Sequence, residues 1–377
     1  MDRTLLGGLA PSAFLKRHWQ KQPLLIRGAV RGFRDPLTLR KLMAFSRSEA
    51  CEARLVISEN DDYEVLFGPF SPRIFRDLPE KHWTLLVQGV NHVCREARDL
   101  LYRFAFLPYA RLDDVMVSYA APGGGVGPHF DSYDVFLLQG CGQRQWEVGT
   151  QSNLDLVPDA DLRILRRFRP QGSCVLSCGD MLYLPPRFAH NGTALDSCVT
   201  YSIGFRAPTH EELKTRFLTH LDDCLHIAGQ YQDPGVKPTR RPAHLDNNMI
   251  TQVAAVMSRI RWNRSDVTSF LGRYLSEPKP YIVLAKQPNL DFQEFSRRAR
   301  VEGIDLHPAL PLLFHGKRAF INGDVLVMKS GSEQAITSLA NERRLTAKQA
   351  RSARRALPIL HGWYGNGYVT LGNGDPK

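Results

Sequence analysis

The stretch Gly123-Gly124-Gly125-Val126-Gly127-Pro128-His129-Phe130-Asp131 carries the strongest structural and chemical signal in the chain. Glycine-rich runs can bind phosphate, but no Gly-Lys-Ser/Thr and no helix start follow this one, so we interpret it as a turn that leads into a strand. In a strand, residues two apart point to the same face, so the side chains of His129 and Asp131 converge on one point. They are half of a 2-His-1-carboxylate facial triad, which holds Fe(II) and leaves coordination positions open.

A third metal ligand is predicted at His190, which closes the stretch Gly179-Asp180-Met181-Leu182-Tyr183-Leu184-Pro185-Pro186-Arg187-Phe188-Ala189-His190. Gly-Asp predicts a turn, the apolar run predicts a strand, and Pro-Pro ends the strand pairing. The chain contains its own control, because His244-Leu245-Asp246 repeats the spacing inside a proline-rich stretch with no strand around it. We interpret that pair as a solvated turn, and we expect His129, Asp131 and His190 to share one metal site.

Short strand-like runs surround both stretches and are separated by Gly, Pro and Asp. Many short strands with turn signals between them are typical of a β-barrel or sandwich. The stretch 83–106 has apolar residues at steps of three to five, which predicts a helix. The predicted strands are 54–57, 63–67, 114–119, 134–138, 144–148, 174–176, 181–184 and 198–205.

Two further residues are candidates to bind a co-substrate. The open positions of such a metal centre suit a bidentate 2-oxo acid and oxygen, and a dicarboxylic acid also needs a fixed cation for its distal carboxylate. Arg144 follows Asp131 by one predicted strand and one turn, so the next strand would bring it back beside the metal. Ser118, on the strand before the glycine run, is a candidate hydroxyl donor to the same carboxylate. The alternatives, a surface arginine and a barrel-wall serine, stay open from spacing alone.

Charge is the unusual feature of the composition. Among 377 residues, 49 Lys and Arg stand against 38 Asp and Glu, for a net charge of +11. This excess favours a polyanionic partner, and it fits a solvated basic surface equally well. No apolar run approaches the roughly 20 residues of a membrane helix and the N-terminus lacks a signal-peptide core, so we expect a cytoplasmic protein. The seven cysteines follow no zinc or disulfide pattern, which indicates reduced thiols.

After residue 208 the pattern becomes mainly helical. Thr209 and Glu212 fit a capping box before an apolar helical face, and a polar, proline-rich linker at 229–247 follows. Asn322-Gly323 between two apolar runs predicts a hairpin. On one helix, positions 344, 348, 351 and 355 would form a basic, phosphate-facing stripe or a solvated face. The other predicted helices are 248–262, 265–275, 332–341 and 347–357.

Taken together, these motifs resemble the JmjC-type bacterial ribosomal oxygenases, which are Fe(II)- and 2-oxoglutarate-dependent protein hydroxylases. The resemblance covers about residues 10–225, and beyond residue 226 only the order of the elements agrees. Combined, the motifs are far more specific than the His-x-Asp pair alone. The stretches that carry the resemblance are Trp19–Leu25, Trp83–His92, Pro122–Asp131, Tyr133–Phe136, Gly179–His190 and Tyr201–Pro208.

The resemblance implies a mainly β fold with α-helices. A double-stranded β-helix (cupin, JmjC) barrel would span residues 1–207. A helical region that forms a homodimer would span residues 208–276, and a winged-helix-like domain would span residues 277–377. His129, Asp131 and His190 would bind Fe(II), and Arg144 and Ser118 would hold 2-oxoglutarate, with O2 as the second co-substrate. The substrate would be a ribosomal protein of the large subunit, hydroxylated at an arginine β-carbon. Its guanidinium could pair with acidic residues near the mouth, of which Asp113, Asp114 and Asp134 are candidates.

This chain departs from the family pattern at Phe130, where an aliphatic residue is usual, and at Asn191, and both bear on the shape of the substrate pocket. Several alternatives remain open. The enzyme could instead be a histidyl hydroxylase of another ribosomal protein or a lysine demethylase. A different class is a catalytically idle cupin that binds the ribosome or RNA through its basic tail. Direct nucleic-acid binding is compatible with the enzyme hypothesis but is not required by it.

Overall fold

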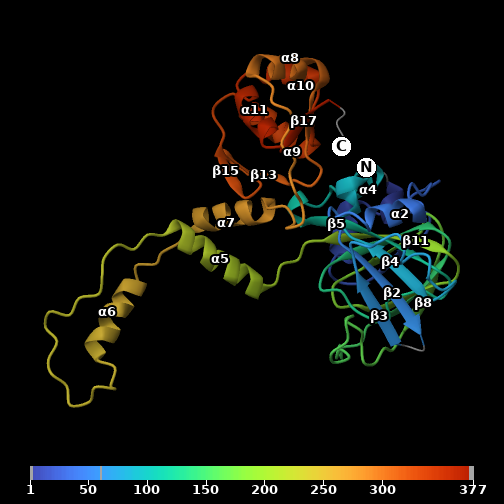
Figure 1. The fold of residues 1–377 in the computed structure, drawn as a ribbon, viewed down its shortest axis with the longest axis horizontal. Helices are drawn as coiled ribbons and strands as arrows, with labels where there is room; N and C mark the ends of the chain where they lie inside the picture. Colours follow the sequence, from blue (N-terminus) through green and yellow to red (C-terminus); the bar gives the residue numbers. More distant parts are fainter. Residues whose placement is uncertain (1–2, 60–61, 373–377) are drawn as a thin grey trace.

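The fold is described from a computed structural model that covers residues 3–59 and 62–372. Figure 1 shows a β-rich part built from the first 205 residues, a second folded part at the C-terminal end, and between them an arm of helices. The tip of this arm, α6, projects away from both folded parts. None of the helices within the described residues is long and apolar enough to cross a membrane.

The β-rich part contains one large antiparallel sheet whose two faces have different partners. One face packs against the N-terminal helices in a core that includes Phe14, Phe104 and Phe136, and the other lines a cavity. Because side chains alternate across a strand, the central strands contribute to both. In spatial order the sheet contains β1 (Leu24–Ile26), β9 (Met181–Leu184), β6 (Val135–Cys141), β11 (Cys198–Phe205), β5 (Leu112–Ala120), β4 (Trp83–Val87), β2 (Ala53–Glu59) and β3 (Asp62–Phe67).

A smaller sheet closes the cavity from the other side. It consists of β10 (Ala189–Ala194), β7 (Arg144–Gly149) and β8 (Gly172–Leu176), in that order. Strand β10 pairs antiparallel with β7, with His190 opposite Val148. The two sheets together form the predicted double-stranded β-helix, and all eight predicted strand stretches lie within strands or overlap them.

The helix predicted over 83–106 is wrong in its first part. Residues Trp83–Val87 form strand β4, and all five are buried. A strand buried on both faces shows no polar alternation, so periodicity cannot distinguish it from a buried helix. The helical part is shorter and consists of α3 (Val90–Val93) and α4 (Arg95–Tyr102). The N-terminal segment adds η1 (Arg3–Leu6), α1 (Pro11–Arg17) and α2 (Leu39–Phe45), and η2 (Tyr109–Arg111) precedes β5.

Three helices connect the barrel to the C-terminal part, as the sequence predicts. In α5 (His210–Cys224), the Thr209 hydroxyl accepts from the Glu212 backbone N–H at 3.0 Å. The Glu212 carboxylate does not complete the capping box; it accepts instead from the Tyr274 hydroxyl at 2.5 Å. None of the residues of α6 (Asn247–Met257) is buried, whereas α7 (Arg264–Ser276) packs against the C-terminal hairpin.

The C-terminal part has its own apolar core. The predicted hairpin is present, and Asn322 and Gly323 have φ of 53° and 76°, the positive values that a tight two-residue turn needs. The predicted basic stripe is wrong, because the helix over 347–357 is split and Arg344 lies in a strand. The elements are α8 (Phe292–Glu302), β12 (Ile304–Leu306), β13 (Leu312–His315), β14 (Arg318–Ile321), β15 (Asp324–Val327), α9 (Glu333–Glu342), β16 (Arg344–Leu345), α10 (Ala347–Ser352), α11 (Leu357–Gly365) and β17 (Val369–Leu371).

Specific contacts join the C-terminal part to the barrel. The Tyr109 hydroxyl donates to the Asn341 carbonyl at 2.8 Å, and the Arg343 guanidinium lies 4.9 Å from the centre of the Tyr102 ring. An ion pair of 2.7 Å links Lys279 to Asp113, at the start of β5. These contacts fix the C-terminal part beside the strand that carries Asp114 and Ser118.

Candidate metal centre and catalytic cavity

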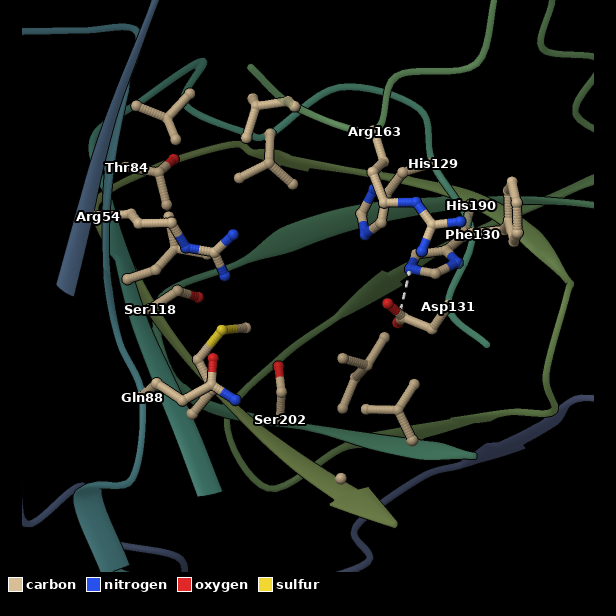
Figure 2. A pocket seen from close by; sticks show the side chains of 18 of the residues that line it. Arg54, Thr84, Gln88, Ser118, His129, Phe130, Asp131, Arg163, His190 and Ser202 are labelled. Carbon is tan, nitrogen blue, oxygen red and sulfur yellow. Dashed lines mark ion pairs between the residues drawn. The ribbon is translucent and has the colours of Figure 1, made fainter. Parts of the chain in front are cut away.

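The structure brings His129, Asp131 and His190 together. One potential ligand atom from each side chain can be chosen so that all three lie within 4.8 Å of one another, and the two imidazole ring centres are 4.3 Å apart. A backbone bridge holds the two histidines, with His129 N–H donating to His190 O at 2.9 Å and His190 N–H to His129 O at 2.8 Å. Figure 2 shows the three side chains converging on one side of the cavity.

The hydrogen bonds of both histidines leave their Nε2 atoms available as ligands. Nδ1 of His129 lies 2.9 Å from the Gly127 carbonyl, and Nδ1 of His190 lies 2.9 Å from the Phe188 carbonyl. Because a carbonyl oxygen can only accept, both Nδ1 atoms carry the proton and each Nε2 keeps its lone pair. Burial and, to a lesser extent, the neighbouring His129 lower the pKa of His190 to about 4, so this imidazole is neutral near pH 7. Two neutral imidazoles and one carboxylate fit a divalent iron.

The control pair has none of these properties. His244 and Asp246 are exposed, and the Asp246 carboxylate accepts from the Asn248 backbone N–H at the start of α6. Within residues 3–59 and 62–372, the triad is the one group of three side chains with metal-ligand geometry.

The triad opens into a cavity of about 310 Å³ between the two sheets. Alternate residues of the large sheet line it, and the small sheet closes it with Arg144, Trp146 and His190. From the large sheet come Arg54, Val56, Thr84, Leu86, Asp114, Met116, Ser118, Val135, Leu137, Ser202 and Gly204.

Arg144 is a buried cation with unused hydrogen-bond donors. Its side chain is 5% exposed, its Nη1 donates to Ser118 Oγ at 3.3 Å, and its Nε and Nη2 have no partner. The Trp146 ring lies 5.8 Å from the guanidinium carbon. A buried guanidinium with two unsatisfied donors is unfavourable unless an anion binds there. The arrangement therefore fits a carboxylate placed between Arg144 and the triad.

The three candidate acidic residues have different environments. Asp134 accepts from the Tyr183 hydroxyl at 2.6 Å inside the core, and Asp113 is paired with Lys279. Only Asp114 lines the cavity, where it is 3% exposed and its Oδ2 has no partner. Burial and, to a lesser extent, the adjacent Asp113 raise the pKa of Asp114 to about 6.

The two departures from the family pattern lie on different faces. The Phe130 ring lines the cavity, and the Arg163 guanidinium carbon lies 5.1 Å from its centre. Arg163 belongs to the 150–171 loop, which is tethered where Leu165 N–H donates to the Pro128 carbonyl at 2.7 Å. Asn191 does not line the cavity; its side chain donates to Glu147 at 3.2 Å.

Sequence reasoning missed several cavity residues. Arg54 lies in a correctly predicted strand, but nothing in the local sequence indicates that β2 faces the metal. Arg163 and Asp161 lie in a long loop without a motif, and only the folded chain places them at the cavity.

Comparisons with known proteins agree with this geometry. The JmjC domain profile matches residues 99–213, and the ROXA-like winged-helix profile matches residues 259–370. The ribosomal protein uL16 3-hydroxylase of Escherichia coli is 32% identical over 338 residues, which cover 89% of this chain and 90% of that protein. The chain belongs to the JmjC-type ribosomal oxygenases.

Other members of this family support the assignment. A probable ribosomal oxygenase of Haemophilus influenzae is 38% identical over 62% of this chain and 57% of its own length. The crystal structure of E. coli ycfD superposes with a TM-score of 0.85 at 31% identity, covering 96% of this chain and 98% of that one. A second ycfD structure, in complex with cobalt and 2-oxoglutarate, has a TM-score of 0.82 at 30% identity and covers 97% and 99% of the two chains.

This ribosomal oxygenase therefore has the predicted fold class, a JmjC cupin barrel followed by a winged-helix domain. As a member of the family it is a 2-oxoglutarate-dependent dioxygenase. Its triad is the donor set that iron(II) enzymes of this class need.

Proposed function

We propose that this ribosomal oxygenase hydroxylates the β-carbon of an arginine in a large-subunit ribosomal protein, in the cytoplasm. The E. coli relative, named a ribosomal protein uL16 3-hydroxylase, supports the substrate class. The observation that carries the choice of arginine is Asp114, a buried carboxylate with an unpartnered oxygen in the catalytic cavity. A guanidinium satisfies such a group with a charge-assisted hydrogen bond, whereas a neutral imidazole supplies a single donor.

In this proposal His129, Asp131 and His190 hold Fe(II). When iron, 2-oxoglutarate and oxygen are bound, they supply an oxidative decarboxylation that yields succinate and carbon dioxide and places one oxygen atom on a substrate C–H. The protein itself contributes positioning. Gly127 and Phe188 fix the imidazole tautomers through their carbonyls.

Arg144 and Ser118 bind the distal carboxylate of 2-oxoglutarate. The two free donors of Arg144 support this role, because a carboxylate can accept from both. At the other end of β5, Asp114 binds the substrate guanidinium. Ser118 and Asp114 are four residues apart on one face of β5, so their backbone positions, one for the distal carboxylate and one for the substrate guanidinium, are about 14 Å apart.

The proposed domain limits are those expected from the sequence: a catalytic barrel over 1–207, a dimerisation region over 208–276 and a winged-helix domain over 277–377. The exposed apolar side chains of α6 support a homodimer, since a lone helix with no buried residue needs a partner. Those exposed by more than a third are Met249, Ile250, Val253, Val256 and Met257.

The test is turnover on isolated ribosomal proteins. Purified enzyme is incubated with Fe(II), 2-oxoglutarate and the large-subunit proteins, and each protein is analysed by mass spectrometry. We expect one protein to gain a single oxygen atom on an arginine, and no gain with the Asp131→Ala variant. If no ribosomal protein gained oxygen, the proposal would be wrong; oxygen on a histidine would overturn the choice of arginine.

A further inference from the structure

A second arginine lines the catalytic cavity without a counterion. Arg54 lies in β2, opposite Leu86 of β4, which in turn lies opposite Ser118 of β5. Residues opposite one another in antiparallel strands point to the same face, so Arg54 and Ser118 share the cavity face. Figure 2 shows the Arg54 guanidinium directed into the cavity beside Thr84 and Ser118.

The cavity supplies no internal partner for this cation. Within residues 3–59 and 62–372, no side chain forms a hydrogen bond or ion pair with the Arg54 guanidinium. The acidic residues that line the cavity are Asp114, Asp131 and Asp161, of which Asp131 lies 3.8 Å from His190. A half-buried arginine held inside a cavity by a strand, without a carboxylate beside it, is suited to an anionic ligand.

Two guanidinium groups thus enter the cavity from different sheets. Arg144 comes from β7 and donates to the Ser118 hydroxyl at 3.3 Å, and Arg54 extends into the same cavity from β2. Like charges repel across a partly desolvated cavity, and an anion between them removes this repulsion. A carboxylate has about four lone-pair sites, which is more than Arg144 and Ser118 together occupy.

We propose that Arg54 is the second arm of a clamp on the distal carboxylate of 2-oxoglutarate, opposite Arg144. The inference rests on the proposed function for the identity of the co-substrate. It adds a binding residue from β2, a strand outside the sequence motifs that identify the site. A substrate guanidinium would be repelled from this end of the cavity, so the clamp also directs the target arginine toward Asp114.

The experiment measures binding without turnover. Enzyme loaded with Mn(II) is titrated calorimetrically with 2-oxoglutarate and with 2-oxopentanoate, which has the same carbon chain but no distal carboxylate. We expect Arg54→Gln to weaken the binding of 2-oxoglutarate roughly ten- to hundredfold, which is the effect of losing a charge-assisted hydrogen bond. The affinity for 2-oxopentanoate should not change. Arg54→Lys should recover part of the loss. Arg166→Gln, which removes an exposed arginine of the 150–171 loop outside the cavity, is the matched control and should change neither affinity.

Three results would overturn the clamp. An unchanged 2-oxoglutarate affinity in Arg54→Gln would show that Arg54 does not bind the distal carboxylate. Equal weakening of both acids shows that Arg54 supports the structure only. An equal loss in Arg166→Gln shows a general charge effect. No ribosomal protein is present, so a failure of the proposed substrate does not affect the measurement.

Discussion

The guanidinium of Arg144 reaches from the three-stranded sheet to the eight-stranded sheet, where its Nη1 donates to Ser118 Oγ at 3.3 Å. This bond joins the two sheets at the end of the cavity away from Asp114. It uses one side of the guanidinium and leaves Nε and Nη2 without partners. The arginine is therefore poorly satisfied until a ligand binds.

Replacement of Arg144 should weaken the binding of 2-oxoglutarate without lowering the stability of the ligand-free protein. We expect Arg144→Met to weaken the binding of 2-oxoglutarate by about a hundredfold or more, because the main cation for its distal carboxylate is lost. The ligand-free protein should be as stable as the wild type or more stable, by up to about 1–3 kcal/mol, because two buried unsatisfied donors are removed. Calorimetric titration and urea unfolding check the two parts. A variant with unchanged affinity would show that Arg144 is not the anchor.

The two His-x-Asp pairs offer a matched test of the metal site. Asp131→Ala should abolish tight binding of Mn(II) or Co(II), because it removes the one carboxylate of the triad. Asp246→Ala should bind metal like the wild type, since Asp246 is an exposed residue that caps α6. Equilibrium dialysis measures both variants. Equal metal loss in both, or in neither, would contradict the assignment.

Asp114 should give stability a defined dependence on pH. Its pKa is raised from 3.8 to about 6, first by burial and then by Asp113, with Lys279 opposing the rise. Between these values the folded protein binds a proton that the unfolded chain releases, so stability falls as pH increases through this window. The other titratable groups that interact with Asp114 are Tyr133, Tyr281 and Cys51.

We therefore expect Asp114→Asn to be more stable than the wild type at pH 7, by up to about 3 kcal/mol, and equal to it near pH 4. Its KM for an arginine substrate should increase, and the wild-type KM should increase as the pH falls below about 6. Thermal melts and steady-state kinetics at several pH values measure these changes. Asp113→Asn is the control, because its carboxylate pairs with Lys279 outside the cavity. If both variants behave alike, Asp114 has no special role.

The exposed face of α6 should determine the oligomeric state. Val253→Glu places a charge among the exposed apolar side chains of this helix and should convert a dimer into monomers, with little change in monomer stability because the residue is not buried in the monomer. Thr251→Glu, on the opposite side of the helix, should remain dimeric. Analytical ultracentrifugation distinguishes the two. A wild-type protein that is monomeric at all concentrations would contradict the prediction.

The sequence was most informative where a short period determines geometry. His129 and Asp131 could be paired because alternation within one strand is a local property, and Arg144 could be proposed because it follows one strand and one turn later. Arg54 could not be predicted as a site residue, because its place in the cavity depends on the register of β2 with β4 and of β4 with β5. Trp83–Val87 was assigned to a helix because burial on both faces removes the period of two. The alternation of side chains along β5 could have predicted that Asp114, and not Asp113, lies on the same face as Ser118.

The pairing of β10 with β7 has a further consequence. His190 lies opposite Val148, and Arg144 lies four residues along the same strand, opposite Ala194. At about 3.4 Å per residue, the backbone positions of His190 and Arg144 are about 14 Å apart along the strand direction. Their side chains extend from these positions into the cavity. In the proposed binding mode, the register of β10 with β7 therefore sets the length of co-substrate that can span the metal and Arg144. A diacid one carbon shorter should bind more weakly, because it cannot reach both at once.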